Sequence, residues 1–465
     1  MCSPKLRVML VAPPGRCTPQ GSFHAVPPEG IARLGAWLRQ RSFDVFALDL
    51  IAEGYDVRKE EGRTVRYGLG ADEAVQRITA CSPDVICLSC LFTCIEPDVL
   101  EIARLCKDAM PASTVVLGGA HAAATASEIL NKEPAVDLVA LGEGEAALAS
   151  LLQCLQDGGE VHDVAGFAYR TSDGGPKSNP VEDYIALDQL PLPAWDLLPV
   201  EFYRRANAPH FGVGAGVRFL PTTWSRGCAQ ACGFCLSSRM WGKGNHRKRS
   251  IEHVLDEARV LKEVHGVEEL HVEDDCLLHD KDWFHSILDA KAERLPELGL
   301  DFSNGLDIRR VDADTASKLA RAKTVRLGLA FDTGVSTREL EWTSKRSSLA
   351  QSKETLAALH DGGIKVVGFF MIGFPGQTVG DMNATVDYAQ SLELDAMSLF
   401  IVTPFPGTRL HAHCEREGLL VPDADPRDFR FSTGLIRTAE FGPEDTERIR
   451  REGWEAFHRR RREDA

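Results

Sequence analysis

The sequence predicts an α/β protein in which two strand–helix series follow one another. In each series, short apolar runs alternate with segments whose apolar residues recur at helical spacing. Such alternation is typical of parallel sheets, because a connection between parallel strands needs a crossover, usually a helix. The predicted domains are a doubly wound parallel sheet over residues 1–156, a linker over 157–219, six strand–helix units over 220–408 and a short helical extension over 409–465.

Composition limits the classes of function. The chain has 465 residues, of which 44% are hydrophobic and 26% charged, as in ordinary soluble globular proteins. A net charge of −15 argues against a nucleic acid partner, which needs a basic surface. No apolar run approaches the roughly 20 residues of a membrane span, and the N-terminus lacks the features of a signal peptide. We therefore expect a cytoplasmic protein, without nucleic acid or membrane partners, whose 13 cysteines are kept reduced.

Glycine-rich turns follow two predicted strands of the first series. Gly118 and Gly119 end one strand, and Gly142 and Glu143 end another. Doubly wound sheets bind ligands at the carboxyl ends of their strands, so these turns are candidate ligand contacts. The expected strands are 6–12, 45–50, 84–91, 114–121 and 137–145, and the expected helices are 30–41, 72–78, 97–109 and 146–155.

The second series begins with an apolar run that leads into a cysteine-rich loop, and an amphipathic helix over 250–265 follows. In barrels of strands and helices, the chemistry takes place at the carboxyl ends of the strands, and this loop has that position. The six expected strands are 219–228, 267–275, 300–310, 324–334, 364–378 and 397–408.

The cysteine-rich loop reads WSRGCAQACGFCLSS and places Cys228, Cys232 and Cys235 in a C-x3-C-x2-C array. Three thiolates do not complete a four-ligand zinc site or a conventional four-cysteine cluster, and no second cysteine pair at zinc-ribbon spacing follows. The loop instead suits a 4Fe–4S cluster with three irons held by protein and one left open. Small residues beside the thiols, including Gly233 ahead of Phe234, let backbone amides approach the sulfurs.

This triad resembles the signature of the radical S-adenosylmethionine (SAM) superfamily, in which the open iron chelates SAM. The resemblance implies that the three cysteines bind the cluster and that residues 220–408 form a partial (β/α)6 barrel. It further implies a small-molecule substrate and an external one-electron donor, such as a flavodoxin, a ferredoxin or a dedicated reductase. SAM would then be cleaved to a 5′-deoxyadenosyl radical that takes hydrogen from an unactivated carbon.

Later turns of the second series resemble the SAM-binding elements of this family. An acidic cluster follows the second strand, where the family often holds the SAM amine or polar groups of the substrate; one of its carboxylates could instead cap the next helix. A thiol directly after this cluster is a candidate for radical chemistry. The implied catalytic candidates are Glu273, Asp274, Asp275 and Cys276, and the implied cofactor contacts are Gly233, Phe234, Asn304, Arg309, Asp332, Thr333, Gly373, Pro375 and Gly376.

The segments PPEGIARLGAWLR, LGGAH and GEGE resemble the cobalamin-binding domain that is fused to many radical SAM enzymes. The resemblance implies that the turns at Gly118-Gly119 and Gly142-Glu143 contact cobalamin. The Asp-x-His-x-x-Gly motif that supplies a lower axial imidazole in other cobalamin domains is absent, and His24 and His121 lie in other contexts. Bound cobalamin and a domain kept only for its structure are both compatible with these residues.

The resemblance leaves three functions open. The first is cobalamin-dependent C-methylation of a small natural product, as in antibiotic biosynthesis. The second is cobalamin-independent dehydration or deoxygenation of a hydroxylated sugar, such as an aminoglycoside, with a separate reductase. The short segment after Thr408 favours this second function, because many methylating relatives have longer C-terminal domains. The third is a non-catalytic iron–sulfur or cofactor-binding protein.

Overall fold

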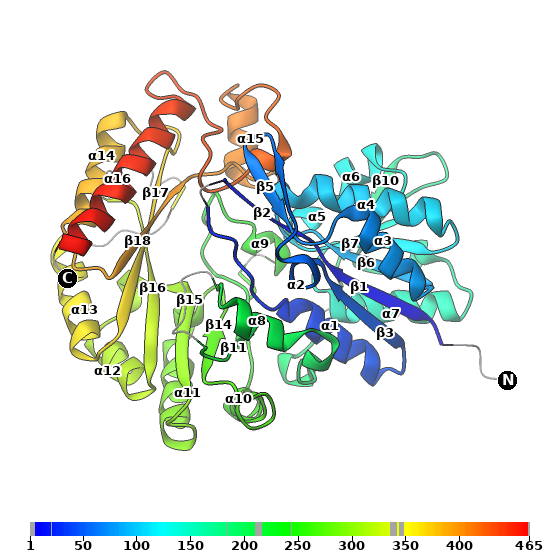
Figure 1. Cartoon of the computed structure of the whole chain (residues 1–465), viewed down its shortest axis with the longest axis horizontal. Coiled ribbons are helices and arrows are strands. Elements are labelled where there is room, and N and C mark those ends of the chain that lie inside the picture. The colour runs from blue at the N-terminus through cyan, green and yellow to red at the C-terminus, as the bar shows by residue number, and fades with distance from the viewer. Residues whose placement is uncertain are drawn as a thin grey trace. The chain divides into compact units, whose positions relative to one another are not determined.

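The computed structural model describes residues 5–19, 21–182, 184–209, 216–242, 244–334, 342–343 and 348–463. The chain divides into two compact units, whose elements are labelled in Figure 1. The first unit contains Met1–Gly216, Arg239–Trp241 and Pro426–Asp428, and the second contains Val217–Ser238, Gly242–Asp425 and Phe429–Ala465. Within the described residues, no helix is long and apolar enough to cross a membrane.

A seven-stranded sheet forms the centre of the first unit. Its order is β10-β9-β8-β7-β6-β1-β3, and the five strands from β8 to β3 are parallel. The strand order reverses between β1 and β6, which is the switch point where doubly wound sheets bind ligands. The predicted doubly wound sheet is therefore confirmed. Its parallel strands are β1 (Arg7–Ala12), β3 (Asp44–Asp49), β6 (Val85–Ser89), β7 (Thr114–Gly118) and β8 (Leu138–Ala140).

Antiparallel strands complete this unit; a small strand is expected at VAGFAYR in the linker, but its antiparallel pairing was not predicted. Strands β9 (Phe167–Arg170) and β10 (Pro176–Ser178) come from the predicted linker and extend the sheet beyond β8. A separate three-stranded sheet has the order β2-β5-β4, from β2 (Gly15–Cys17), β4 (Arg58–Glu61) and β5 (Thr64–Tyr67). Strand β4 reads RKEE, and a fully charged strand gives no alternation of apolar and polar residues to detect.

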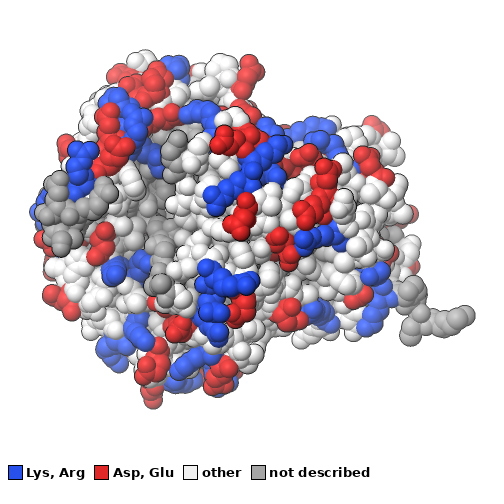
Figure 2. All heavy atoms as spheres, in the orientation of Figure 1, with Lys and Arg blue, Asp and Glu red and all other residues white. Residues whose placement is uncertain are grey.

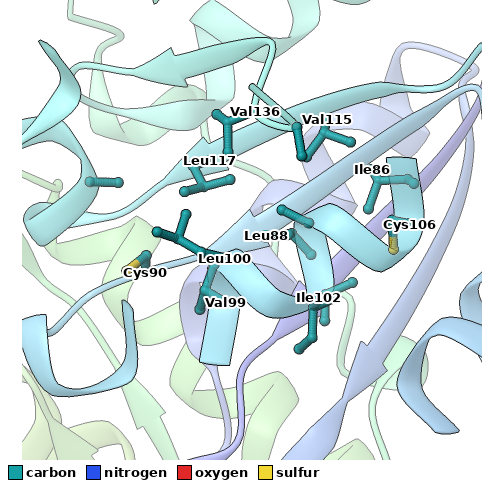
Figure 3. Close-up of a cluster of buried hydrophobic side chains, with 14 of the residues drawn as sticks. Ile86, Leu88, Cys90, Val99, Leu100, Ile102, Cys106, Val115, Leu117 and Val136 are labelled. Carbon is teal, nitrogen blue, oxygen red and sulfur yellow. The ribbon is translucent and has the colours of Figure 1, made fainter. Parts of the chain in front are cut away.

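Helices cover both faces of the first sheet. Figure 3 shows the core on one face, where α4 (Glu96–Ala109) packs on β6 and β7 through aliphatic side chains. Helix α3 (Ala71–Ala80) joins the same core, whereas α1 (Glu29–Gln40) contacts α7 (Gly144–Gln156) and the strands β1 and β3. The cysteines at positions 90, 94 and 106 belong to the core and are buried there as small apolar groups.

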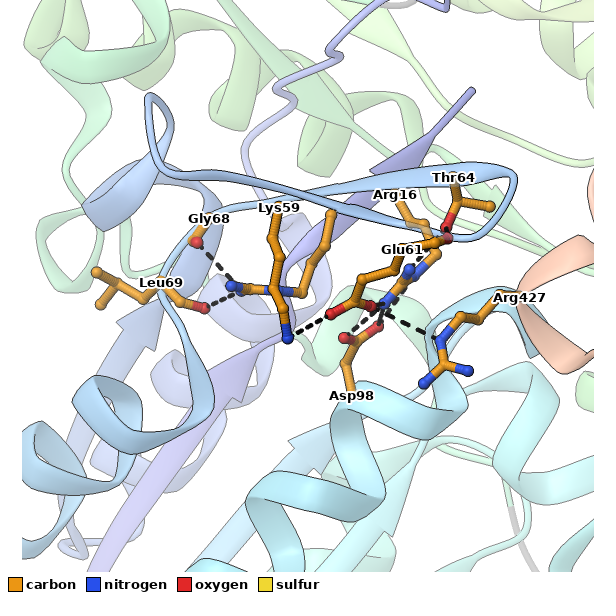
Figure 4. A network of polar contacts seen from close by, with 9 residues as sticks. Arg16, Lys59, Glu61, Thr64, Gly68, Leu69, Asp98 and Arg427 are labelled. Carbon is orange, nitrogen blue, oxygen red and sulfur yellow. Dashed lines mark hydrogen bonds and ion pairs between the residues drawn. The ribbon is translucent and has the colours of Figure 1, made fainter. Parts of the chain in front are cut away.

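A buried arginine fixes the small antiparallel sheet to α4 (Figure 4). The guanidinium of Arg16 donates to Asp98 on α4, at 2.7 Å, and to Glu61 on β4, at 2.8 Å. Arg427, from the part of the first unit that comes late in the chain, lies with its Nε 3.7 Å from the Glu61 carboxylate. A fully buried guanidinium needs such partners, because an unpaired buried charge is strongly destabilising.

The second unit contains a six-stranded parallel sheet in which the strands follow their sequence order, β11-β14-β15-β16-β17-β18. A helix follows each strand, and the C-terminal helix α16 (Pro443–Glu463) packs on β18 and α14. The predicted six strand–helix units are confirmed. The strands are β11 (Phe219–Thr222), β14 (Glu269–Val272), β15 (Gly299–Asp307), β16 (Thr324–Asp332), β17 (Lys365–Ile372) and β18 (Ala396–Ile401).

Each of the six helices that follow these strands begins with a side-chain N-cap. The capping oxygen accepts a hydrogen bond from the backbone N–H three residues later, which satisfies one of the free amides of the first turn. The helices are α10 (Ile251–His265), α11 (Lys281–Arg294), α12 (Ala313–Arg321), α13 (Leu349–Asp361), α14 (Val379–Gln390) and α15 (Arg409–Arg416), capped by Ser250, Asp280, Asp312, Ser348, Thr378 and Thr408.

Charges of both signs are interspersed on the molecular face shown in Figure 2. Many exposed charges lie in ion pairs, such as Arg294 with Glu252 at 2.7 Å. Such pairs contribute little stability each.

Candidate functional site

The cysteine loop leaves the carboxyl end of β11 through a short strand, β12 (Ser225–Arg226), which pairs with β13 (Arg247–Lys248). Gly227 follows at φ +104°, and a Cβ there would lie 1.7 Å from the carbonyl oxygen of Asn245. The chain therefore needs glycine at this position in order to turn into the loop. Of the three thiols beyond the turn, those of Cys228 and Cys232 are half-buried, and Cys235 is exposed.

The carboxylate of Asp274 holds the start of this loop. One oxygen accepts the backbone N–H of Trp224, at 2.8 Å, and the other accepts the N–H and the hydroxyl of Ser225. Asp274 is 3% exposed, so these bonds are made away from water. The side chain thus acts as a backbone anchor between the ends of β14 and β11, which differs from the SAM contact that the family resemblance implies.

A buried ion pair supports the same strand end from the other side. Arg249 and Glu257 are each 1% exposed and lie 2.9 Å apart. Glu257 accepts the hydroxyl of Thr222, at 2.8 Å, and Arg249 donates to the carbonyl oxygen of Thr223, at 3.0 Å. These bonds attach the last residues of β11 to helix α10.

The middle of the loop is held by distant segments of the second unit. Gly233 donates its N–H to the carbonyl oxygen of Trp342, at 2.8 Å, and its own carbonyl accepts from Leu410, at 2.9 Å. A Cβ at Gly233 would lie 2.8 Å from the Trp342 ring, so a larger residue at this position would displace the indole ring. Phe234 packs edge-on against Phe374, with ring centroids 5.8 Å apart.

Asp275, next to Asp274, contacts the loop near its thiols. Asp275 is exposed and accepts the hydroxyl of Ser237, at 2.6 Å, while the Ser237 N–H donates to the sulfur of Cys235, at 3.4 Å. The nearby side chain of Cys276 and burial together raise the pKa of the Cys228 thiol. The exit of β14 therefore contacts the cysteine loop through the carboxylates of Asp274 and Asp275.

The third and fourth strands bring further predicted residues near the loop. Arg309 forms a 2.6 Å ion pair with Asp307, which raises its pKa, and the charges of Asp332 and Cys232 add to the effect. Asn304 donates its amide to the carbonyl oxygen of Glu273, at 3.0 Å, and so supports the exit of β14. Arg309 and Arg409, whose guanidinium donates to the carbonyl oxygen of Ala231 at 3.1 Å, are cations near the cysteine loop, where an anionic ligand group would be stabilised.

The glycine-rich turn after β17 is rigid. Gly373 adopts φ +90°, and its N–H and that of Phe374 both donate to the side-chain oxygen of Gln377, at 2.8 and 3.0 Å. The carbonyl oxygen of Pro375 accepts the Trp342 ring N–H. A Cβ at Gly376 would meet no atom within 4 Å, so there is open space beside this turn. Thr333, which follows β16, is buried. The turn therefore offers room for a ligand, and its assignment to SAM stays a prediction.

The donor set of the loop fits an iron–sulfur cluster. Three thiols without a fourth ligand on the loop suit a cluster with one open iron, and an N–H already points at one sulfur. Among the described residues, the group whose ligand atoms all lie within 4.8 Å of one another is Glu269, His271 and Asp301. Arg326 already pairs with Asp301, so we read this group as an internal ion-pair network.

In the first unit, the glycines at the strand ends have different surroundings. Gly119 adopts φ +105°, and a Cβ there would lie 2.7 Å from the carbonyl oxygen of Cys90; a Cβ at Gly142 would lie 3.0 Å from Val181. Gly119 is thus required by its backbone conformation and by its backbone contact, whereas Gly142 only packs tightly against a valine side chain. A Cβ at Gly118 would meet only that of Ala140, at 4.0 Å. The space beside Gly118, at the carboxyl end of β7, is therefore not filled by other side chains of the unit.

The polar groups at this sheet edge are locked together. His121 is 1% exposed; its Nδ1 bonds to the Thr93 hydroxyl, at 3.1 Å, and its Nε2 to Glu96, at 2.5 Å. With both ring nitrogens occupied, His121 does not offer an axial ligand to cobalt. By contrast, Leu91 and Phe92 are 49% and 51% exposed at the end of β6, beside Gly118 and Gly119. An open glycine edge next to exposed apolar side chains fits a large, partly apolar cofactor.

Two family models match the chain. Residues 222–389 match the radical SAM superfamily, and residues 23–152 match the B12 binding domain. The chain is a radical SAM enzyme with a B12-binding domain. The predicted cofactors, a 4Fe–4S cluster, SAM and cobalamin, are those that these two families imply. Radical SAM enzymes also need a reductant and a substrate.

Known relatives of this radical SAM enzyme cover nearly its whole length. It is 28% identical to cytidylyl-2-hydroxyethylphosphonate methyltransferase from Streptomyces wedmorensis, over 88% of this chain and 82% of that protein. It is 27% identical to an uncharacterised methyltransferase from Pyrococcus horikoshii, over 98% and 93%. Its fold is similar to that of the radical SAM methyltransferase TsrM from Kitasatospora setae, with a TM-score of 0.71, 17% identity and coverage of 96% and 81%.

We predict that replacing Cys228, Cys232 or Cys235 with Ala removes the cluster from this radical SAM enzyme, because each thiolate holds one iron. Iron per chain, measured after anaerobic reconstitution, should fall to near zero in each variant. Cys90→Ala is the matched control, since that thiol lies in the apolar core. Loss of iron in Cys90→Ala and retention in Cys232→Ala would show that the ligands are misassigned.

We predict that Asp274→Asn weakens cluster retention. An amide offers one acceptor oxygen in place of two and leaves a buried backbone N–H of Trp224 or Ser225 without its partner, at a cost of about 1–3 kcal/mol. Iron retained after gel filtration should fall in Asp274→Asn and stay at the parental level in Asp282→Asn, an exposed control on α11. Equal retention in both variants would mean that Asp274 does not anchor the loop.

We predict that Gly118→Val lowers the cobalt content several-fold and leaves the iron content unchanged. The chain itself leaves room for a side chain at Gly118, so the substitution obstructs a ligand rather than the fold. Gly30→Val, at the exposed start of α1 with no atom within 4 Å of the added Cβ, controls for the general effect of valine. Parental cobalt in Gly118→Val would place the cofactor away from this edge.

Proposed function

We propose that this radical SAM enzyme transfers a methyl group to an unactivated carbon of a small molecule, with cobalamin as the methyl carrier. The observation that carries the proposal is the B12-binding domain on the same chain as the cysteine triad. Relatives named as methyltransferases support it, among them the Streptomyces protein, a hopanoid C-3 methylase from Methylococcus capsulatus and a bacteriochlorophyllide methyltransferase from Chlorobaculum tepidum.

When bound, the cluster and SAM supply a carbon-centred radical, and cobalamin supplies a transferable methyl group. The chain's own part is to hold the reacting groups in place and to keep water out. Asp274 and the Arg249–Glu257 pair fix the start of the cluster loop, and Trp342 and Leu410 fix its middle. These supports combine a buried carboxylate that accepts backbone N–H groups, a buried side-chain ion pair and backbone hydrogen bonds, and together they hold the loop at the end of β11.

The main argument for dehydration was the short segment after Thr408. A relative named as a methyltransferase, from Pyrococcus, aligns over 98% of this chain and 93% of its own length, so this argument is weak. A short C-terminal extension is therefore compatible with a relative that carries the name of methyltransferase. Relatives also include anaerobic magnesium-protoporphyrin IX monomethyl ester cyclases, so the product has to be identified directly.

The proposal predicts a product that carries one methyl group from SAM. We would incubate the anaerobic, cobalamin-loaded enzyme with a reductant, methyl-deuterated SAM and a small-molecule extract of a strain that lacks the gene. We expect a new compound with a deuterated methyl group on carbon, and none with Cys232→Ala. A product that has lost water, formed without cobalt, would establish dehydration instead.

A further inference from the structure

The helices of the second unit cover one face of its six-stranded sheet. The strands follow sequence order, and right-handed crossovers between such strands place the connecting helices on the same side. In Figure 1, α12, α13, α14 and α16 lie on the outer side of β16, β17 and β18. A Cβ added at Gly453 on α16 would lie 3.3 Å from Leu399 on β18, so Leu399 faces this helix. Its neighbour Phe400 points to the opposite face, which we call the inner face of the sheet.

The amino half of the inner face is filled by packed side chains. Asp301 on β15 and Arg326 on β16 are partners in register and form an ion pair, with the Asp301 side chain fully buried. In the next layer, the ring of Phe369 on β17 lies across two glycines. A Cβ added at Gly305 or Gly328 would approach this ring to 2.8 or 2.6 Å. A ligand on the inner face therefore has to lie beyond Phe369, toward the carboxyl ends of the strands.

Three more phenylalanines continue from Phe369 toward these carboxyl ends. The ring centroids lie 6.0 Å apart for Phe369 and Phe400, 5.3 Å for Phe400 and Phe431, and 5.5 Å for Phe405 and Phe431. Phe400 and Phe405 are half-buried, whereas Phe431 is 43% exposed. The carbonyl oxygen of Phe431 accepts the N–H of Ile401, at 2.7 Å, which holds the ring at the end of β18. We call these four rings the aromatic wall.

The aromatic wall lies at the same end of the sheet as the cysteine loop. The carbonyl oxygen of Phe405 accepts the hydroxyl of Thr408, at 2.7 Å, and Thr408 caps α15. The first turn of α15 in turn holds the loop, because Leu410 donates its N–H to the carbonyl oxygen of Gly233, at 2.9 Å. One short turn therefore joins the exposed end of the aromatic wall to the loop that is predicted to hold the cluster.

We propose that the aromatic wall binds the substrate and that the substrate carries an aromatic or heteroaromatic ring. Aromatic rings prefer offset or edge-on contacts with centroids about 4.5–7 Å apart, which is the spacing within the wall. A further ring on Phe431 would continue this series and remove its exposed face from water. The exit of β15 instead carries the ion pair of Asp307 and Arg309, so the wall is the apolar side of the site. The inference rests on the proposed function, because it takes the substrate to be a small molecule that is methylated beside the cluster.

The binding test uses two probes of similar size, benzyl alcohol and cyclohexylmethanol, titrated into the anaerobic holoenzyme and observed by NMR of the probe. We expect benzyl alcohol to bind more tightly. Phe431→Leu keeps an apolar side chain but removes the ring, and should weaken the binding of benzyl alcohol about fivefold. Phe431→Tyr keeps the ring and should bind as the parent does. Trp454→Leu, which removes a similarly exposed ring from α16, is the matched control and should have no effect.

The product of the labelling experiment gives a second readout. The compound with the deuterated methyl group should show aromatic proton signals. Equal binding of the two probes, unchanged binding in Phe431→Leu, or an equal loss in Trp454→Leu would overturn the proposal. A methylated product without an aromatic ring would also overturn it and would leave methyl transfer intact. Binding that prefers the aromatic probe, without any methylated product, would support the wall as a ring-binding site and refute methyl transfer.

Discussion

The bond between the Asp274 carboxylate and the backbone of residues 224–225 is the constraint on which the active loop depends. The loop contains two glycines and two alanines among the residues from Trp224 to Ser238. A cluster ligand set needs fixed geometry, and here it comes from a buried carboxylate that occupies two backbone amides at once. Asp274 follows β14, which pairs with β11. The start of the loop is therefore attached to two strands that are hydrogen-bonded to each other.

In the first unit, a glycine and a histidine hold the ends of two neighbouring strands together. Gly119 lets the chain pass close to Cys90, so that the ends of β6 and β7 meet without a side chain between them. His121 then bonds to Thr93 and Glu96 across the same gap. Burial alone would raise the pKa of Glu96, but its bonds to His121 and Lys132 lower it, so that the carboxylate stays charged. The polar groups at this sheet edge are thus all hydrogen-bonded to one another, whereas the neighbouring exposed side chains, Leu91 and Phe92, are apolar.

The residues after β14 illustrate how one strand end can serve a neighbouring loop in several ways. Asp274 accepts two backbone N–H groups, and Asp275 accepts the hydroxyl of the serine whose N–H reaches Cys235. Each contact suits its residue: the buried carboxylate satisfies two amides, and the exposed carboxylate accepts a hydroxyl. Glu273, whose carbonyl oxygen accepts from Asn304, completes the turn. One short segment therefore supports both the start of the cysteine loop and the residues after Cys235.

The sequence by itself determined the fold class and predicted the cluster ligands. Both depend on local patterns, namely the alternation of apolar strands with helices and three cysteines within eight residues. The open iron follows from counting ligands, which requires no coordinates. Strand β4 was not predicted because all of its residues are charged, and β5, which reads TVRY, is too short to show a clear alternation.

Only the tertiary structure decided what the acidic segment and the glycines do. Alternation along the strand separates Asp274 from its neighbours but does not say that its carboxylate meets the amides of Trp224 and Ser225, 50 residues earlier in the chain. Likewise, three glycines look equivalent in sequence, yet Gly119 and Gly142 are fixed by internal contacts and Gly118 is not. The reason is physical: a motif specifies the donors and acceptors of a segment, whereas their partners are set by which strands the fold brings side by side.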